Sequence, residues 1–212
     1  MPQNIELNWV GPFSYFDIVA ACRSKDNKHL LSDYDKPGVY LHATEVCGLA
    51  CVDYIGKSKS SVLRRQIEHF TNWIGGRYTI PFYCRECKKT IIPDLKNGEY
   101  ADLVLDKTKF INHVSECFDS AANIDVYFAV IVEQNGEKLK NAVNAMERKL
   151  LYDLQPFTTD RGTYTEVCPE YSYLFSGVLK DMKTVFRKNN LAIYNKYGRE
   201  EPLFMKRKVD HL

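Results

Sequence analysis

Two short apolar runs decide the fold: PGVYLHA at residues 37–43 and CVDYIG at residues 51–56. Each run is rich in β-branched and aromatic residues, and a more polar connection separates them. This is the pattern of two strands joined as an antiparallel hairpin. One tyrosine lies on each strand, Tyr40 in a Gly-Val-Tyr triplet and Tyr54 in a Tyr-Ile-Gly triplet. We therefore expect a β-hairpin that carries two phenol groups.

A helix is expected directly after the hairpin. Residues 60–74 place apolar side chains at intervals of four, three and four, which predicts the core-facing stripe of a helix: Leu63, Ile67, Phe70 and Ile74. Arg65 and His69 are one turn apart, so they should project together from nearly the opposite side. The pair Gly75-Gly76 then ends the helix.

A second strand–helix pair follows later in the chain. DVYFAVIVE at residues 125–133 is a nearly continuous apolar run, typical of a strand in the middle of a sheet. Residues 137–154 have the apolar spacing of a helix that Pro156 halts. Glu147 lies on the flank of that apolar face, where a carboxylate is costly unless a cation meets it.

The two triplets, the Arg-x-x-x-His helix and Glu147 on a helix that ends at Pro156 resemble the GIY-YIG nucleases. The resemblance covers about residues 37–72 and 125–159. It implies an α+β fold (α/β in the broad sense) with a small, mostly antiparallel three-stranded sheet flanked by helices. The implied activity is metal-dependent hydrolysis of phosphodiester bonds in double-stranded DNA. The architecture is similar to the type II restriction endonucleases of that family, which dimerise and cut at specific sites.

The resemblance also implies a catalytic set, namely Tyr40, Tyr54, Arg65, His69 and Glu147. Glu147 would hold Mg²⁺ or Mn²⁺, because a hard cation that keeps several waters needs as little as one carboxylate as its anchor. Arg65 suits a forked contact with phosphate oxygens, and His69 can take or relay a proton. Tyr40 would be the general base or hold the attacking water, with Tyr54 shaping the site beside it.

A phenol with an unperturbed pKa near 10 is a poor base at pH 7, so this role of Tyr40 requires a metal-bound water or a nearby cation. Lys57 and Arg65 are placed to depress its pKa. Gly56 matches the family glycine after the second strand. One position departs from the family pattern: the asparagine that usually follows the proline is absent, and Thr158 or Thr159 stands there.

We divide the chain into an N-terminal extension (1–36), a nuclease-like core (37–159) with an insertion (77–124), and a C-terminal helical extension (160–212). The first extension holds a short amphipathic helix over Phe13–Arg23, and the last holds one over Tyr171–Asn189. The insertion has an irregular pattern with short strand-like pieces.

The insertion contains a candidate structural zinc site, formed by Cys84 and Cys87 with His113 and Cys117. The spacings C-x₂-C and H-x₃-C put paired ligands on one metal. The alternative is that the cysteines are buried small hydrophobes and that His113 with Cys117 forms one turn of a helix.

Composition sets outer limits on function. The chain has 212 residues, 45% hydrophobic and 26% charged, with a net charge of +2, so the total charge neither requires nor excludes a polyanionic partner. Local charge matters more, and Lys57, Lys59 and Arg64 are candidate contacts to a nucleic-acid backbone.

No apolar run has the length of a membrane span, and the N-terminus lacks the pattern of a secretory signal. With seven cysteines expected to be reduced, we predict a cytoplasmic protein.

Other interpretations remain open at this stage. Taken singly, each tyrosine is a hairpin packing residue, Arg65 and His69 are a solvated helix face, and Glu147 is an ion pair with Lys140 or a remote lysine. Taken together, the same residues also fit a non-cleaving nucleic-acid-binding protein on the same fold, or a homing or repair-type nuclease.

Overall fold

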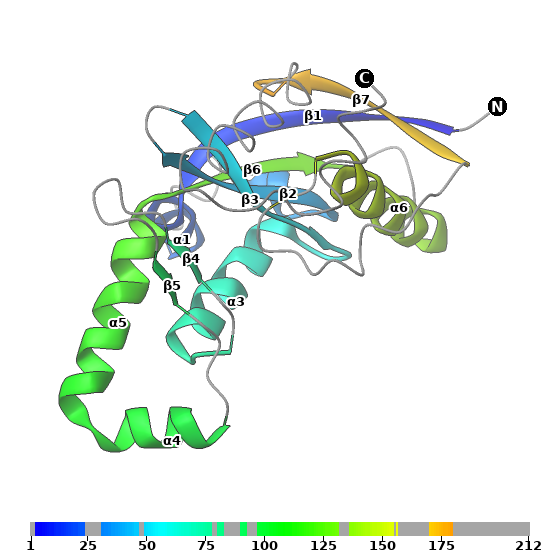
Figure 1. Cartoon of the computed structure of the whole chain (residues 1–212). Helices are drawn as coiled ribbons and strands as arrows, with labels where there is room; N and C mark the ends of the chain where they lie inside the picture. Colours follow the sequence, from blue (N-terminus) through cyan, green and yellow to red (C-terminus); the bar gives the residue numbers. More distant parts are fainter. Residues whose placement is uncertain are drawn as a thin grey trace.

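A five-stranded mixed sheet forms the centre of the computed structural model, which describes residues 3–23, 31–46, 49–77, 80–82, 90–92, 97–131, 136–154, 156 and 170–179 (Figure 1). The strand order is β3-β2-β6-β1-β7, and every neighbouring pair is antiparallel except β1 with β7. The strands are β1 (Gln3–Ser14), β2 (Gly38–Val46), β3 (Leu49–Ser58), β6 (Ile124–Val130) and β7 (Tyr171–Gly177). The α+β class is confirmed.

The prediction of a three-stranded sheet is wrong, because strands from both ends of the chain extend it. β1 comes from the segment that we treated as an N-terminal extension. Its side chains alternate between exposed and buried, with Ile5, Leu7 and Trp9 turned into the core. β7 then pairs with β1 in parallel, with Gln3 opposite Tyr171.

The predicted C-terminal helix is wrong over Tyr171–Gly177, where the structure has β7; the remainder, residues 180–189, lies outside the described residues. The helix prediction placed Leu174 and Val178 on a buried stripe, yet both side chains are 58% exposed. The aromatic residues Tyr171, Tyr173 and Phe175 instead recur with a period of two and pack against the core. Alternating aromatic residues are a strand signal, and they explain why this segment forms a strand and not a helix.

Helices cover both faces of the sheet (Figure 1). One face packs against α6 (Gly136–Leu154), and we call the resulting cluster the α6-side core; Val39, Leu41 and Met146 belong to it. The other face packs against α1 (Tyr15–Arg23), α3 (Val62–Ile74) and α5 (Lys107–Ala122), which form the α3-side core. A 3₁₀ turn, η1 (Ser32–Tyr34), precedes β2.

The insertion is more regular than its sequence pattern indicated. Its described part holds a small antiparallel hairpin, β4 (Ile80–Phe82) with β5 (Thr90–Ile92), followed by α4 (Asn97–Leu105) and α5. Asp106 caps α5 by accepting hydrogen bonds from the backbone N–H groups of Thr108 and Lys109. Figure 1 shows α5 running away from the sheet, with α4 at its far end.

The predicted hairpin is confirmed as β2 with β3. The strand predicted from residue 125 is confirmed as β6, and the helix predicted to carry Glu147 is confirmed as α6. No helix in the described part of the chain is both long enough and apolar enough to cross a membrane.

Candidate functional site

The register of the hairpin places the two tyrosines on one face. Tyr40 lies opposite Gly56, and His42 lies opposite Tyr54. A Cβ added to Gly56 would be 2.4 Å from Cζ and from the hydroxyl oxygen of Tyr40, and 2.7 Å from Cε1 of Tyr54. Only glycine at this position lets the ring of Tyr40 cross β3. The glycine of the Tyr-Ile-Gly triplet therefore has a steric purpose in this structure.

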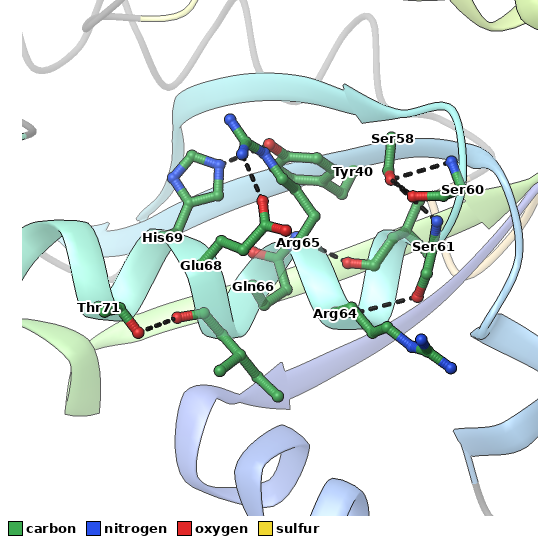
Figure 2. Close-up of polar contacts among 12 residues, drawn as sticks. Tyr40, Ser58, Ser60, Ser61, Arg64, Arg65, Gln66, Glu68, His69 and Thr71 are labelled. Carbon is green, nitrogen blue, oxygen red and sulfur yellow. Dashed lines mark hydrogen bonds and ion pairs between the residues drawn. The ribbon is translucent and has the colours of Figure 1, made fainter.

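Helix α3 brings two further predicted residues to Tyr40 (Figure 2). Its start is fixed by Ser61, whose side chain accepts a hydrogen bond from the backbone N–H of Arg64. One and two turns into the helix, Arg65 and His69 reach the tyrosine. The hydroxyl of Tyr40 and Nε2 of His69 are 2.6 Å apart, and the guanidinium of Arg65 is also hydrogen-bonded to that hydroxyl.

Burial sets the protonation states of this pair. It raises the pKa of Tyr40 well above 10, and the neighbouring hydroxyl of Tyr54 adds to the rise while Arg65 opposes it. The pKa of His69 falls to about 2, first because of burial and then because of His42 and Arg65. At neutral pH both groups are therefore uncharged, and the contact between the hydroxyl of Tyr40 and Nε2 of His69 is a hydrogen bond between neutral groups. The expectation that nearby cations lower the pKa of Tyr40 overall is wrong, because desolvation is the larger effect.

The side of α3 that faces the core also differs from the prediction. The buried residues are Val62, Leu63, Gln66, His69 and Trp73. His69 is only 4% exposed, so it belongs to the buried side and not to the solvated one. Arg65 lies at the boundary: its side chain is 32% exposed, and Nη1 donates to Oε2 of Glu68 at 2.5 Å. It can be reached from solvent while it contacts Tyr40.

Glu147 lies on the other face of β3. Its Oε2 accepts a hydrogen bond from Nζ of Lys57 at 2.5 Å, and the two side chains are 17% and 30% exposed. Lys57 follows Gly56 on the strand, so it points to the opposite face, where it lies across from Val39 of the α6-side core. We expected Arg65 and a metal ion to meet the charge of Glu147; the cation that meets it here is a remote lysine, Lys57.

The other predicted backbone contacts lie near the start of α3. Lys59 is exposed. Arg64 is also exposed, at 74% of its side chain, and its Nη2 donates to Oδ2 of Asp35 at 2.9 Å. A nucleic acid that binds here would therefore meet Lys59 directly, whereas Arg64 is engaged with Asp35 and Lys57 with Glu147.

A buried polar cluster beside Tyr40 was missed by the sequence analysis. Nε2 of His42 is 2.7 Å from Oε1 of Gln66 and 3.1 Å from the hydroxyl of Tyr15, which also donates to Oε1 of Gln66 at 3.1 Å. Tyr15 comes from α1, His42 from β2 and Gln66 from α3. Two signals were present in the sequence: His42 follows Tyr40 at the strand period of two, and Gln66 lies three residues before His69.

The described residues contain no cluster of three or more side chains of the His, Cys, Asp or Glu type that could hold a metal. A cation at Glu147 would therefore have one protein carboxylate, which fits a hard ion that keeps most of its water and does not fit a closed protein cage.

The zinc prediction concerns four residues, of which Cys84 and Cys87 lie outside the described residues, as do Thr158 and Thr159. His113 and Cys117 are buried on α5, with Nε2 and Sγ 3.6 Å apart. The thiol also donates to the backbone carbonyl of Trp73 at 3.5 Å, and burial raises its pKa to about 11. The structure thus brings this half of the predicted set together, and zinc binding stays a prediction.

The chain was compared with protein-family models, with curated proteins and with solved structures, and none of them matches it.

Proposed function

We propose that this protein is a metal-dependent endonuclease of the GIY-YIG type that hydrolyses double-stranded DNA. The observation that carries the proposal is the contact between Tyr40 and His69, 2.6 Å long and supported by Arg65. These three residues come from a strand and a helix, and they meet where Gly56 leaves room for the ring. Packing alone does not require a phenol, an imidazole and a guanidinium at one point.

The protonation states define a chemical route. A water hydrogen-bonded to the oxygen of Tyr40 gives up its proton to that oxygen as it attacks phosphorus, while Tyr40 passes its own proton to Nε2 of His69. No free phenolate forms, so the raised pKa of Tyr40 is compatible with this role. His69 is neutral at physiological pH because burial lowers its pKa to about 2, so it can accept a proton only if the negative charge of a bound phosphate raises that pKa.

Arg65 supplies positive charge beside the reacting group. Its side chain is 32% exposed, so a phosphate can approach it from solvent. A guanidinium offers two parallel N–H donors to phosphate oxygens, and such contacts stabilise the charge that develops on phosphorus in the transition state. Glu68 already accepts one hydrogen bond from Arg65, which orients the guanidinium before substrate arrives.

Glu147 would hold Mg²⁺ or Mn²⁺, which supplies charge neutralisation at the phosphate and at the leaving oxygen. The carboxylate is partly exposed and, within the described residues, belongs to no group of three or more possible metal ligands, in keeping with an ion that draws its other ligands from water and phosphate. Lys57 now occupies Oε2 of Glu147, so a cation must compete with this ammonium group. Once displaced, Lys57 is free to contact the DNA backbone beside Lys59 and Arg64.

Within this proposal we assign the protein to the site-specific restriction type, acting in the cytoplasm and as a homodimer on duplex DNA. The second candidate is a non-cleaving nucleic-acid-binding protein on the same fold. One observation favours it: the ion pair of Lys57 with Glu147 satisfies the carboxylate without any metal.

Incubation of the purified protein with plasmid and phage DNA in Mg²⁺ separates the two candidates. We expect discrete fragments from the native protein, and at least a hundredfold slower cleavage by Tyr40→Phe and by Glu147→Gln. Glu137→Gln is the matched control, because Glu137 is an exposed carboxylate on the same helix that pairs with Lys140 at 3.3 Å. A gel shift of DNA with no cleavage by the native protein in Mg²⁺ or Mn²⁺ would refute the nuclease and support the binding protein.

A further inference from the structure

His42 lies at the centre of the aromatic cluster around the reacting tyrosine. Its side chain is buried, and its ring centroid is 5.4 Å from that of Tyr40 and 5.3 Å from those of Tyr54 and His69. It therefore contacts every ring of the candidate site. The route proposed above, however, gives it no proton to carry.

The hydrogen bonds of His42 fix its orientation. The amide nitrogen of Gln66 donates to the backbone carbonyl of Val62 at 3.2 Å, which leaves Oε1 of Gln66 facing the histidine as an acceptor. Because Oε1 cannot donate, the short contact of 2.7 Å places the proton on Nε2 of His42. The hydroxyl of Tyr15 completes the set from α1.

These contacts join β2 and α3, whose relative position sets the distance between Tyr40 and His69. β2 carries both Tyr40 and His42, and α3 carries both Gln66 and His69. Gln66 and His69 are three residues apart on the buried side of the helix. A hydrogen bond from His42 to Gln66 thus runs beside the hydrogen bond between Tyr40 and His69, and both cross the same strand–helix interface. Buried polar groups without partners are costly, so the inner pair resists any shift that would lengthen it.

We propose that His42, held by Gln66 and Tyr15, is a positioning residue that keeps Tyr40 and His69 in hydrogen-bonding contact. The inference rests on the proposed function only in taking Tyr40 as the reacting group. Two features support it. First, the pKa of His42 is lowered to about 4 by burial, so the residue stays neutral and places no positive charge beside the histidine that must accept a proton. Second, the cluster links α1, and with it the N-terminal part of the chain, to the site.

Two substitutions test the role from opposite sides. His42→Phe keeps a ring of similar size and removes its hydrogen bonds, whereas Gln66→Met keeps the histidine and removes its acceptor. Trp73→Phe is the matched control, since Trp73 packs on the rings of His42 and His69 through ring contacts alone. All three change the α3-side core, and thermal unfolding reports how much stability each one loses.

The first readout is independent of cleavage. In ¹⁵N-histidine-labelled protein, we expect the His69 signal of the native chain and of Trp73→Phe to show an unprotonated, hydrogen-bonded Nε2. In His42→Phe and Gln66→Met this signal should move toward the mixture of tautomers of a free imidazole. An unchanged His69 signal in both variants would overturn the inference, whether or not the protein cuts DNA.

The second readout uses cleavage kinetics. We expect His42→Phe and Gln66→Met to lower kcat by 10- to 100-fold with KM changed less than twofold, because misplacement of a reacting group by about 1 Å costs up to about a hundredfold in rate. An equal loss of kcat in Trp73→Phe at a similar Tm would show a general packing role and also overturn the inference. A native protein that cuts no DNA would refute the proposed function, and the His69 signal would still decide the role of His42.

Discussion

The two buried histidines should make the fold sensitive to mild acid. The pKa of His42 is about 4 and that of His69 about 2, in each case chiefly because burial disfavours the charged imidazolium. In the unfolded chain both groups return to about 6.5. As the pH falls below 6.5, the unfolded chain takes up protons that the folded protein does not, so the free energy of unfolding must decrease. The stabilising contribution is complete above pH 6.5 and is lost as the pH falls toward the folded values.

The size of the effect follows from the pKa differences. One pKa unit corresponds to about 1.4 kcal/mol, so each histidine lowers the free energy of unfolding by about 1.4 kcal/mol for each pH unit below 6.5. Between pH 6.5 and pH 5.0 this amounts to about 1.6 kcal/mol for each of the two, or about 3 kcal/mol together, because the unfolded histidine is only half protonated at pH 6.5. A typical domain has only about 5 to 15 kcal/mol in total, so the loss is large.

Urea unfolding at several pH values between 7.5 and 5.0 measures this dependence. The slope of the native protein contains contributions from other titrating groups, but these are shared by variants. We therefore expect the slope to fall by about 1.4 kcal/mol per pH unit in His69→Gln and by a similar amount in His42→Phe. If both variants keep the slope of the native protein, the two histidines are not held neutral in the folded state, and the proton route through His69 loses its basis.

Three further changes test other parts of the structure. Gly56→Ala should destabilise the fold by about 1 to 3 kcal/mol because its Cβ would lie 2.4 Å from a tyrosine ring, whereas Gly75→Ala, whose nearest neighbour is 3.3 Å away, should cost less in the same urea unfolding experiment. Lys57→Met should tighten Mg²⁺ binding at Glu147 in calorimetry, since the competing ammonium group is gone; weaker or equal binding would contradict this competition. Elemental analysis of the native protein should find about one zinc per chain if the predicted zinc site exists, and Cys84→Ser should abolish it.

Much of the fold was predictable because its signals are local. The hairpin strands and the strand around residue 126 are short apolar runs, and the helix that carries Glu147 has a helical apolar period; each was found within a few residues. The pairing of Tyr40 with Gly56 follows from the hairpin once its register is known. These elements depend on contacts between neighbours in the chain.

The outer strands were not predictable in the same way. β1 pairs with β6 and β7, so its place in the sheet depends on residues more than a hundred positions away. The face of α3 was also misjudged, for a different reason. Hydrophobic spacing favoured Ile67 and Phe70 as core residues, whereas the structure buries Gln66 and His69 more deeply. A polar side chain can be buried when another element supplies its partner, and here His42 and Tyr40 on β2 do so.

The position of β3 gives the candidate site its final constraint. The Tyr40 cluster lies on one face of this strand and Glu147 on the other, so the two halves would be separated by backbone if β3 were in the middle of the sheet. Among the described strands, however, β3 is at the edge, and no strand lies beyond it. For the two halves to act on one phosphodiester, as the proposed function requires, the phosphate must approach this edge. The successive residues Gly56 and Lys57 mark the place: the glycine leaves room for Tyr40, and the lysine turns toward Glu147. The proposed nuclease therefore requires DNA to bind along the edge of β3. Substitutions that add side-chain bulk at this edge should slow cleavage more than they lower the free energy of unfolding.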